Sequence, residues 1–141
     1  MPVGHGFTLI IFSPATFRPL LPYAVENGLR IITMNMRDYR GSTPYRQDEL
    51  ADMTSPDLQA QTLAVRRWGQ EISRFLLYVC ETMNIPEVAV NGDRKSGGIV
   101  LMTWSLSNLG SLAILGDPAT LGDEKAKLAR YLRRVIFYGM L

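Results

Sequence analysis

The feature that most constrains the fold of this chain is an alternation of short apolar runs with stretches of helical periodicity. The run 29–36 follows Gly28 and is rich in β-branched residues, and the run 98–103 is almost continuously apolar. Runs of this kind are typical of strands that helices cover on both faces. The alternation therefore predicts an α/β fold with about three to four mainly parallel strands and flanking helices.

Helix signals occupy the segments between these runs. The clearest helix is expected to begin with Ser55 as its N-cap, Pro56 at the first helical position and Asp57 at the positive end of the dipole. Its apolar residues then share one helical face as far as Met83, and it is expected to end near Asn84. Further helices are expected within 17–26, 107–116 and 123–133, with a last strand over 134–138. The turn-rich segments 37–54 and 91–98 are expected to be loops.

Composition narrows the class of protein. A length of 141 residues suits one domain, and 47% hydrophobic with 20% charged residues is ordinary for a folded chain. A net charge of +2 with scattered arginines gives no argument for nucleic-acid binding. The single cysteine, Cys80, cannot form an internal disulfide and is expected to be a small buried hydrophobe. We see no targeting segment and no membrane span, which favours a cytoplasmic location.

The candidate catalytic residue lies in the segment Thr103-Trp104-Ser105-Leu106-Ser107, between an expected strand and an expected helix. A serine at a sharp strand-to-helix turn presents its hydroxyl above the sheet edge, and the helix N-terminus offers an N–H group to a developing oxyanion. The usual pattern is Gly-x-Ser-x-Gly, but Thr103 and Ser107 replace both glycines here. The alternative is that the serine only caps the helix.

Four stretches along the chain resemble the α/β-hydrolase superfamily, in particular a branch of fungal-looking serine hydrolases. They match, in order, the family's oxyanion loop, the loop after its fourth strand, its fifth strand with the nucleophile elbow, and the start of its sixth strand. The stretches are 5–8 (His-Gly-Phe-Thr), 35–45 (Asn-Met-Arg-Asp-Tyr-Arg-Gly-Ser-Thr-Pro-Tyr), 97–108 (Gly-Gly-Ile-Val-Leu-Met-Thr-Trp-Ser-Leu-Ser-Asn) and 131–138 (Tyr-Leu-Arg-Arg-Val-Ile-Phe-Tyr).

The resemblance implies an esterase-like hydrolase that acts on a small ester or similar acyl bond. Ser105 would be the nucleophile, and the backbone N–H groups of Phe7 and Leu106 would form the oxyanion hole. His5 and Trp104 would line the pocket. The resemblance implies no cofactor and no metal, and no His/Cys/carboxylate cluster in the sequence has metal-ligand spacing.

The sequence also departs from the family. A second register is open, in which 8–12 forms the third strand and Ser13-Pro14 replaces His-Gly in the oxyanion turn. The family order is serine, acid, histidine, whereas the only histidine here is His5. We therefore expect residues 1–141 to be a partial hydrolase domain, from the oxyanion loop through the sixth strand, without the N-terminal strands and the C-terminal acid and histidine. Such a fragment is expected to be inactive or nearly so, since serine needs a base.

Three functions remain open at this point. The first is a serine hydrolase, inactive as this fragment. The second is a non-catalytic remnant that binds a partner or self-associates through open sheet edges. The third is a Rossmann-like or flavodoxin-like ligand-binding domain, which would carry a glycine-rich phosphate turn after its first strand.

Overall fold

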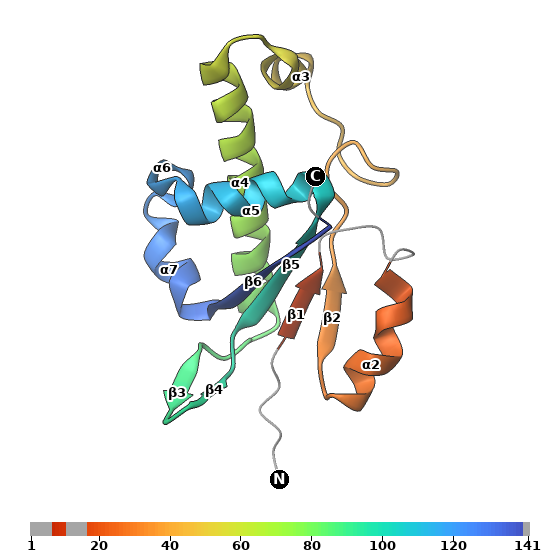
Figure 1. Cartoon of the computed structure of the whole chain (residues 1–141), viewed down its shortest axis with the longest axis vertical. Helices are drawn as coiled ribbons and strands as arrows, with labels where there is room; N and C mark the ends of the chain where they lie inside the picture. The colour runs from red at the N-terminus through yellow and green to blue at the C-terminus, as the bar shows by residue number, and fades with distance from the viewer. Residues whose placement is uncertain (1–6, 11–16, 140–141) are drawn as a thin grey trace.

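The computed structural model describes residues 7–10 and 17–139, and it confirms the predicted mixture of helices and strands (Figure 1). The described residues also include two short 3-10 helices, labelled η. In chain order the elements are β1 (Phe7–Ile10), η1 (Arg18–Leu20), α2 (Leu21–Glu26), β2 (Arg30–Thr33), α3 (Gln47–Thr54), α4 (Leu58–Thr82), β3 (Ala89–Asn91), β4 (Arg94–Ser96), β5 (Ile99–Trp104), η2 (Ser105–Ser107), α5 (Asn108–Gly116), α6 (Pro118–Leu121), α7 (Glu124–Tyr131) and β6 (Leu132–Tyr138).

Four strands form a parallel sheet in the order β2-β1-β5-β6. The chain places β2 on one side of β1 and then crosses, through α3 and α4, to place β5 on the other side (Figure 1). The direction of winding therefore reverses between β1 and β5. In open α/β sheets such a reversal leaves a crevice at the carboxyl ends of the strands, where ligands bind.

The main core lies on the face of the sheet that α4 covers. Ile99 and Leu101 of β5 are almost completely buried there, together with Ile72 and Leu76 of α4 and Leu128 of α7. Burial of a Leu or Ile side chain contributes about 2 kcal/mol. This cluster therefore fixes β5, the strand that precedes the candidate serine, against the longest helix of the chain.

The opposite face of the sheet is covered less completely. Met102 and Trp104 of β5 pack there against Phe17, which precedes η1. At the neighbouring edge strand β6, Ile136 is 38% exposed and Tyr138 is 58% exposed. An apolar strip next to the sheet edge is thus open to solvent.

Two glycines allow α4 and α5 to cross at close range. A Cβ atom on Gly110 would lie 2.6 Å from Cδ1 of Ile72, and a Cβ atom on Gly69 would lie 3.1 Å from the carbonyl oxygen of Gly110. Larger residues would push the helices apart. Because α5 directly follows η2, this close packing also fixes the helix that leaves the candidate serine turn.

Regular structure occurs in both segments that were predicted to be loops. Residues 91–98 belong largely to an antiparallel hairpin, in which β3 pairs with β4 across a turn at Gly92, whose φ is 59°. The two central residues of this turn are Gly92 and Asp93, and Gly at the first central position is favoured in such a turn. Residues 37–54 end in α3.

The predicted N-cap of the long helix was also wrong by two residues. The helix begins at Leu58, because the Asp57 carboxylate accepts the N–H of Gln59 at 3.1 Å. Ser55 instead accepts the N–H of Asp57. The described helices include none that combines the length and the apolar character needed to cross a bilayer.

Candidate active site

Ser105 stands at the turn between β5 and the following helices, with an unusual backbone conformation. Its φ is 53°, in a region that non-glycine residues seldom adopt. Trp104 before it is extended, and Ser107 after it is right-handed helical. The change from strand to helix is therefore concentrated at Ser105, as the predicted strand-to-helix turn requires. Strain of this kind persists only where surrounding contacts hold it.

Contacts on both sides hold the turn. The N–H of Ser105 donates to the carbonyl oxygen of Gly139, after the neighbouring strand β6, at 3.2 Å. The hydroxyl of Ser107 donates to the carbonyl oxygen of Trp104 at 2.8 Å and accepts the N–H of Trp104 at 3.1 Å. Ser107 is 2% exposed, so its hydroxyl is committed to the turn and is not a candidate nucleophile.

Thr103 takes the place of the first glycine of the usual pattern. Its side chain is completely buried on the face that α4 covers, and its Oγ1 has no hydrogen-bond partner among the described residues. The site accommodates the extra side chain, but a buried hydroxyl without a partner costs free energy.

Leu106 is one of the two residues whose N–H groups are predicted to form an oxyanion hole. It is the second residue of η2, and α5 follows directly. N–H groups in the first turn of a helix lack intrahelical acceptors and carry the positive end of the dipole. The Leu106 N–H therefore belongs to the first helical turn directly after Ser105.

Phe7, the other predicted oxyanion donor, is at the wrong end of the sheet. β1 pairs with β5 in parallel, and Phe7 is level with Ile99. Ser105 follows Ile99 by six residues, which corresponds to about 20 Å along a strand. The register that placed the oxyanion loop at 5–8 was therefore wrong. β1 begins at Phe7 and agrees, over its described residues, with the alternative in which 8–12 is the strand. Residues Ser13 and Pro14, which that register assigns to the oxyanion turn, lie outside the described residues.

Of the two residues predicted to line the pocket, His5 and Trp104, the structure describes only Trp104. His5 lies outside the described residues. Trp104 packs edge-to-face against Phe17, with ring centroids 6.2 Å apart and an interplanar angle of 88°. Its ring therefore faces the side of the sheet opposite α4.

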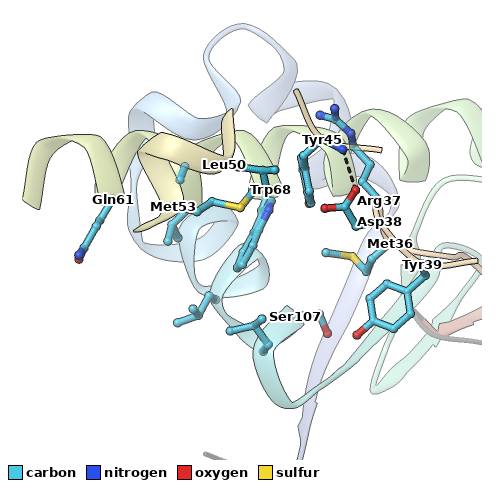
Figure 2. A pocket seen from close by; sticks show the side chains of 14 residues that line it. Met36, Arg37, Asp38, Tyr39, Tyr45, Leu50, Met53, Gln61, Trp68 and Ser107 are labelled. Atoms are coloured by element: carbon cyan, nitrogen blue, oxygen red, sulfur yellow. Dashed lines mark hydrogen bonds between the residues drawn. The ribbon is translucent and has the colours of Figure 1, made fainter. Parts of the chain in front are cut away.

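A cavity of about 570 Å³ opens beside the turn at the carboxyl ends of β2 and β5. Figure 2 shows Trp68 and Met53 on one side of this cavity, with Met36 and Tyr39 on the other. The lining comes from the segment after β2, from α3, from the first part of α4 and from the candidate turn. It comprises Met36, Arg37, Asp38, Tyr39, Tyr45, Leu50, Met53, Gln61, Ala64, Val65, Trp68, Leu106, Ser107 and Leu109. Most of it is apolar, as in small-molecule sites.

Arg37 holds the wall of this cavity together. Its guanidinium forms a two-point ion pair with Glu49 at 2.7 and 2.9 Å, and it donates to Glu71 at 2.9 Å. It also lies over the ring of Tyr45, with Cζ 4.3 Å from the ring centroid. These contacts join the segment after β2 to α3 and α4. The hydrogen bond from Arg37 lowers the pKa of Glu49 to about 2, and burial raises the pKa of Tyr45 to about 12.

The nearby acidic residues are engaged in turns and ion pairs. Asp38, whose φ is 64°, accepts the N–H of Tyr45 at 2.8 Å (dashed in Figure 2). Asp117 caps α6 and pairs with Arg66 at 2.7 Å. Within residues 7–10 and 17–139, neither has a hydrogen bond that would make it the acid of a triad. The sequence pattern does not indicate the ion-pair cluster around Arg37, because its members, Arg37, Glu49 and Glu71, are far apart in the chain.

The prediction for Cys80 can be compared with the structure. Cys80 is 1% exposed, as expected of a small buried hydrophobe, and this burial raises the pKa of its thiol to about 11. Over 7–10 and 17–139, no three His, Cys, Asp or Glu side chains form a group that could hold a metal ion. What the described residues bring together is therefore a strained serine, a helix N-terminus and an apolar cavity. Comparison of the chain with protein-family models, curated proteins and solved structures found no match.

Proposed function

We propose that this chain carries the nucleophile turn of a serine acyl hydrolase, and that Ser105 is the residue that accepts the acyl group. The observation that carries the proposal is the φ of 53° at Ser105, at the carboxyl end of a parallel strand and directly before a helix. A serine that only capped the helix would have no need of this conformation, because N-cap residues ordinarily lie in the β region.

Three further features support the same function. Ser105 follows β5, one of the two strands that border the reversal of winding. The Leu106 N–H lies at the start of the helical segment behind it. A cavity lined by Leu106 and Ser107 offers room for a substrate next to the turn.

The reaction would begin with attack of the Ser105 Oγ on the carbonyl carbon of an ester. The negative charge that develops on the carbonyl oxygen would be held by the Leu106 N–H. Collapse of this intermediate breaks the bond to the alcohol oxygen, which leaves with the proton that Ser105 gave up. Water then cleaves the acyl-serine, and the products are a carboxylic acid and the restored hydroxyl.

Proton removal limits this chemistry in the chain as it stands. A serine hydroxyl is a weak nucleophile near neutral pH unless a base accepts its proton. The described residues contain no histidine. We therefore propose that Ser105 reacts slowly without an added base, and that turnover of an ester is negligible.

The test is labelling with a fluorophosphonate, with and without imidazole as an external base. The Ser105 oxygen bonds to phosphorus, fluoride leaves, and imidazole takes the proton. Intact-mass analysis of the 141-residue chain should show one adduct that forms at least about tenfold faster with imidazole, and peptide mapping should place it on Ser105.

Two variants control this experiment. Ser105→Ala should remove the adduct. Ser96→Ala, which changes an exposed serine of β4, should leave the adduct unchanged. Absence of an adduct with imidazole, or an adduct that persists in Ser105→Ala, would contradict the proposal.

A second candidate is a flavodoxin-like ligand-binding domain, which the strand order favours. Numbered among themselves, the four parallel strands have the order 2-1-3-4, which flavodoxin-like sheets share. In those folds the phosphate turn follows the first strand, and here residues 11–16 lie outside the described part. Thermal stabilisation by flavin mononucleotide, together with an unreactive Ser105, would favour this candidate over the hydrolase.

A further inference from the structure

An apolar groove runs from the serine turn along the junction of α4 and α5. The cavity beside the turn and a second cavity of about 320 Å³ share two lining residues, Gln61 and Val65 of α4. Leu106 and Leu109 line the first cavity, and Leu112 lines the second. The two cavities therefore border one another at these residues, and we call them together the α4–α5 groove.

The groove leaves apolar side chains in solvent. Leu106 and Leu112 are each 52% exposed, and Leu58, which lines the far part, is 75% exposed. Leu106, Leu109 and Leu112 follow one another at a spacing of three residues along η2 and α5. An apolar ligand that lay on this row would remove its surface from water, which favours binding in proportion to the apolar area covered.

The groove has a defined direction and length. It begins at Leu106, the residue after Ser105, and it ends near Gly116 and Asp117 at the end of α5. Ten residues of helix separate Leu106 from Gly116, a distance of about 15 Å. Asp117 pairs with Arg66 there at 2.7 Å, so the end of the groove is polar.

We propose that the α4–α5 groove binds the tail of a single long-chain acyl group, whose carboxyl end lies at the Leu106 N–H. This inference rests on the proposed function, because it assigns the substrate of the same serine to the class of long-chain acyl esters. The apolar lining and the start at the serine turn favour one linear chain, and the ion pair at the far end limits the length of that chain. The volume of the cavity at the turn lies in the range of small-molecule sites.

The first experiment measures binding without any reaction. Isothermal titration calorimetry with dodecanoate, octanoate and acetate, each below its micellar concentration, should give an affinity that rises with chain length. Each additional buried methylene should tighten binding about three- to fourfold. Ser105→Ala should bind dodecanoate as the wild type does, since the tail makes no use of the hydroxyl. Equal, unmeasurable binding of dodecanoate and acetate would overturn the proposal.

A matched pair of variants on one helix locates the tail. Leu112 and Leu115 are 52% and 58% exposed on α5, but Leu115 lines neither part of the groove. Leu112→Glu should weaken dodecanoate binding at least about tenfold and should weaken octanoate binding less, because the shorter tail stays near the turn. Leu115→Glu should change neither. Equal losses in the two variants would assign the binding to nonspecific surface adsorption and overturn the proposal.

The failure of this inference is distinguishable from failure of the proposed function. Imidazole-dependent labelling of Ser105 without length-dependent binding would contradict the groove alone. Length-dependent binding without labelling of Ser105 would contradict the hydrolase function, and the groove would then be a lipid-binding site. Circular dichroism melts of both leucine variants establish that they fold, as expected for exposed positions.

Discussion

The hydroxyl of Ser107 binds both backbone groups of Trp104, donating to the carbonyl oxygen at 2.8 Å and accepting the N–H at 3.1 Å. The two residues flank the turn at Ser105, so this pair of hydrogen bonds closes the loop of backbone that holds the strained serine. Glycine in place of Ser107 would remove both of these hydrogen bonds to Trp104. Ser107, which replaces the second glycine of the usual elbow pattern, is therefore a structural part of this turn.

Replacement of Ser107 should destabilise the chain through these bonds. Ser107→Ala should lower the free energy of unfolding by about 1–3 kcal/mol, because it removes both hydrogen bonds of a buried hydroxyl. Urea denaturation followed by circular dichroism measures the change. Ser96→Ala, at an exposed position of β4, is the matched control and should change the stability by less than about 0.5 kcal/mol. Equal stabilities of the two variants would contradict this role of Ser107.

The positive φ of Ser105 predicts an unusual response to glycine. Ser105→Gly should be about 1 kcal/mol more stable than Ser105→Ala, because alanine keeps the left-handed strain and glycine does not. Ser96 lies in extended β4, where the order should reverse and the alanine variant should be the more stable. Chemical denaturation of the four variants compares them. If alanine is preferred at both positions, Ser105 does not adopt this conformation in solution.

The buried hydroxyl of Thr103 predicts a stabilising substitution. Thr103→Val keeps the shape of the side chain and removes an Oγ1 that has no partner among the described residues, so the chain should gain about 1 kcal/mol. Thr103→Ser keeps the hydroxyl and loses a buried methyl group, and it should therefore be less stable than the wild type. Thermal melts of both variants test the pair. A destabilised Thr103→Val would mean that the hydroxyl has a hydrogen-bond partner.

The ion pair of Arg37 with Glu49 makes the stability depend on pH in the acid range. The pKa of Glu49 in the folded chain is about 2, below its ordinary value of 4.5, mainly because Arg37 donates hydrogen bonds to the carboxylate. The carboxylate therefore stabilises the fold fully above pH 4.5, and this contribution is lost as the pH falls from 4.5 towards 2. Glu49→Gln should be less stable than the wild type at pH 7, and the difference should shrink over that window. Urea denaturation at a series of pH values measures it, and a constant difference would contradict the prediction.

The open strip at β6 predicts weak self-association. β6 is an edge strand, and Ile136 and Tyr138 expose apolar surface beside it. Sedimentation velocity at rising protein concentration should show association that Ile136→Lys reduces. Leu115→Lys, at an exposed apolar position of α5, is the control and should leave the association unchanged. An equal effect of both variants would mean that the edge of the sheet is not the contact.

The sequence by itself determined the order and type of most elements. The apolar run before Ser105 became β5, the periodic stretch after Ser55 became α4, and the final run became β6. These are local properties, since side-chain periodicity follows directly from the repeat of a helix or a strand. The serine turn could be located for the same reason, because it required only a strand, a helix and the residues between them.

Tertiary structure alone decided how these elements meet. The register of β1 against β5 placed Phe7 level with Ile99 and so removed it from the oxyanion site, although the sequence likeness had suggested it. The Arg37–Glu49–Glu71 cluster and the α4–α5 groove likewise join residues that are distant in the chain. The pattern of apolar and polar residues along the sequence does not indicate such contacts, because the pairing of strands and the crossing of helices depend on how the whole core packs.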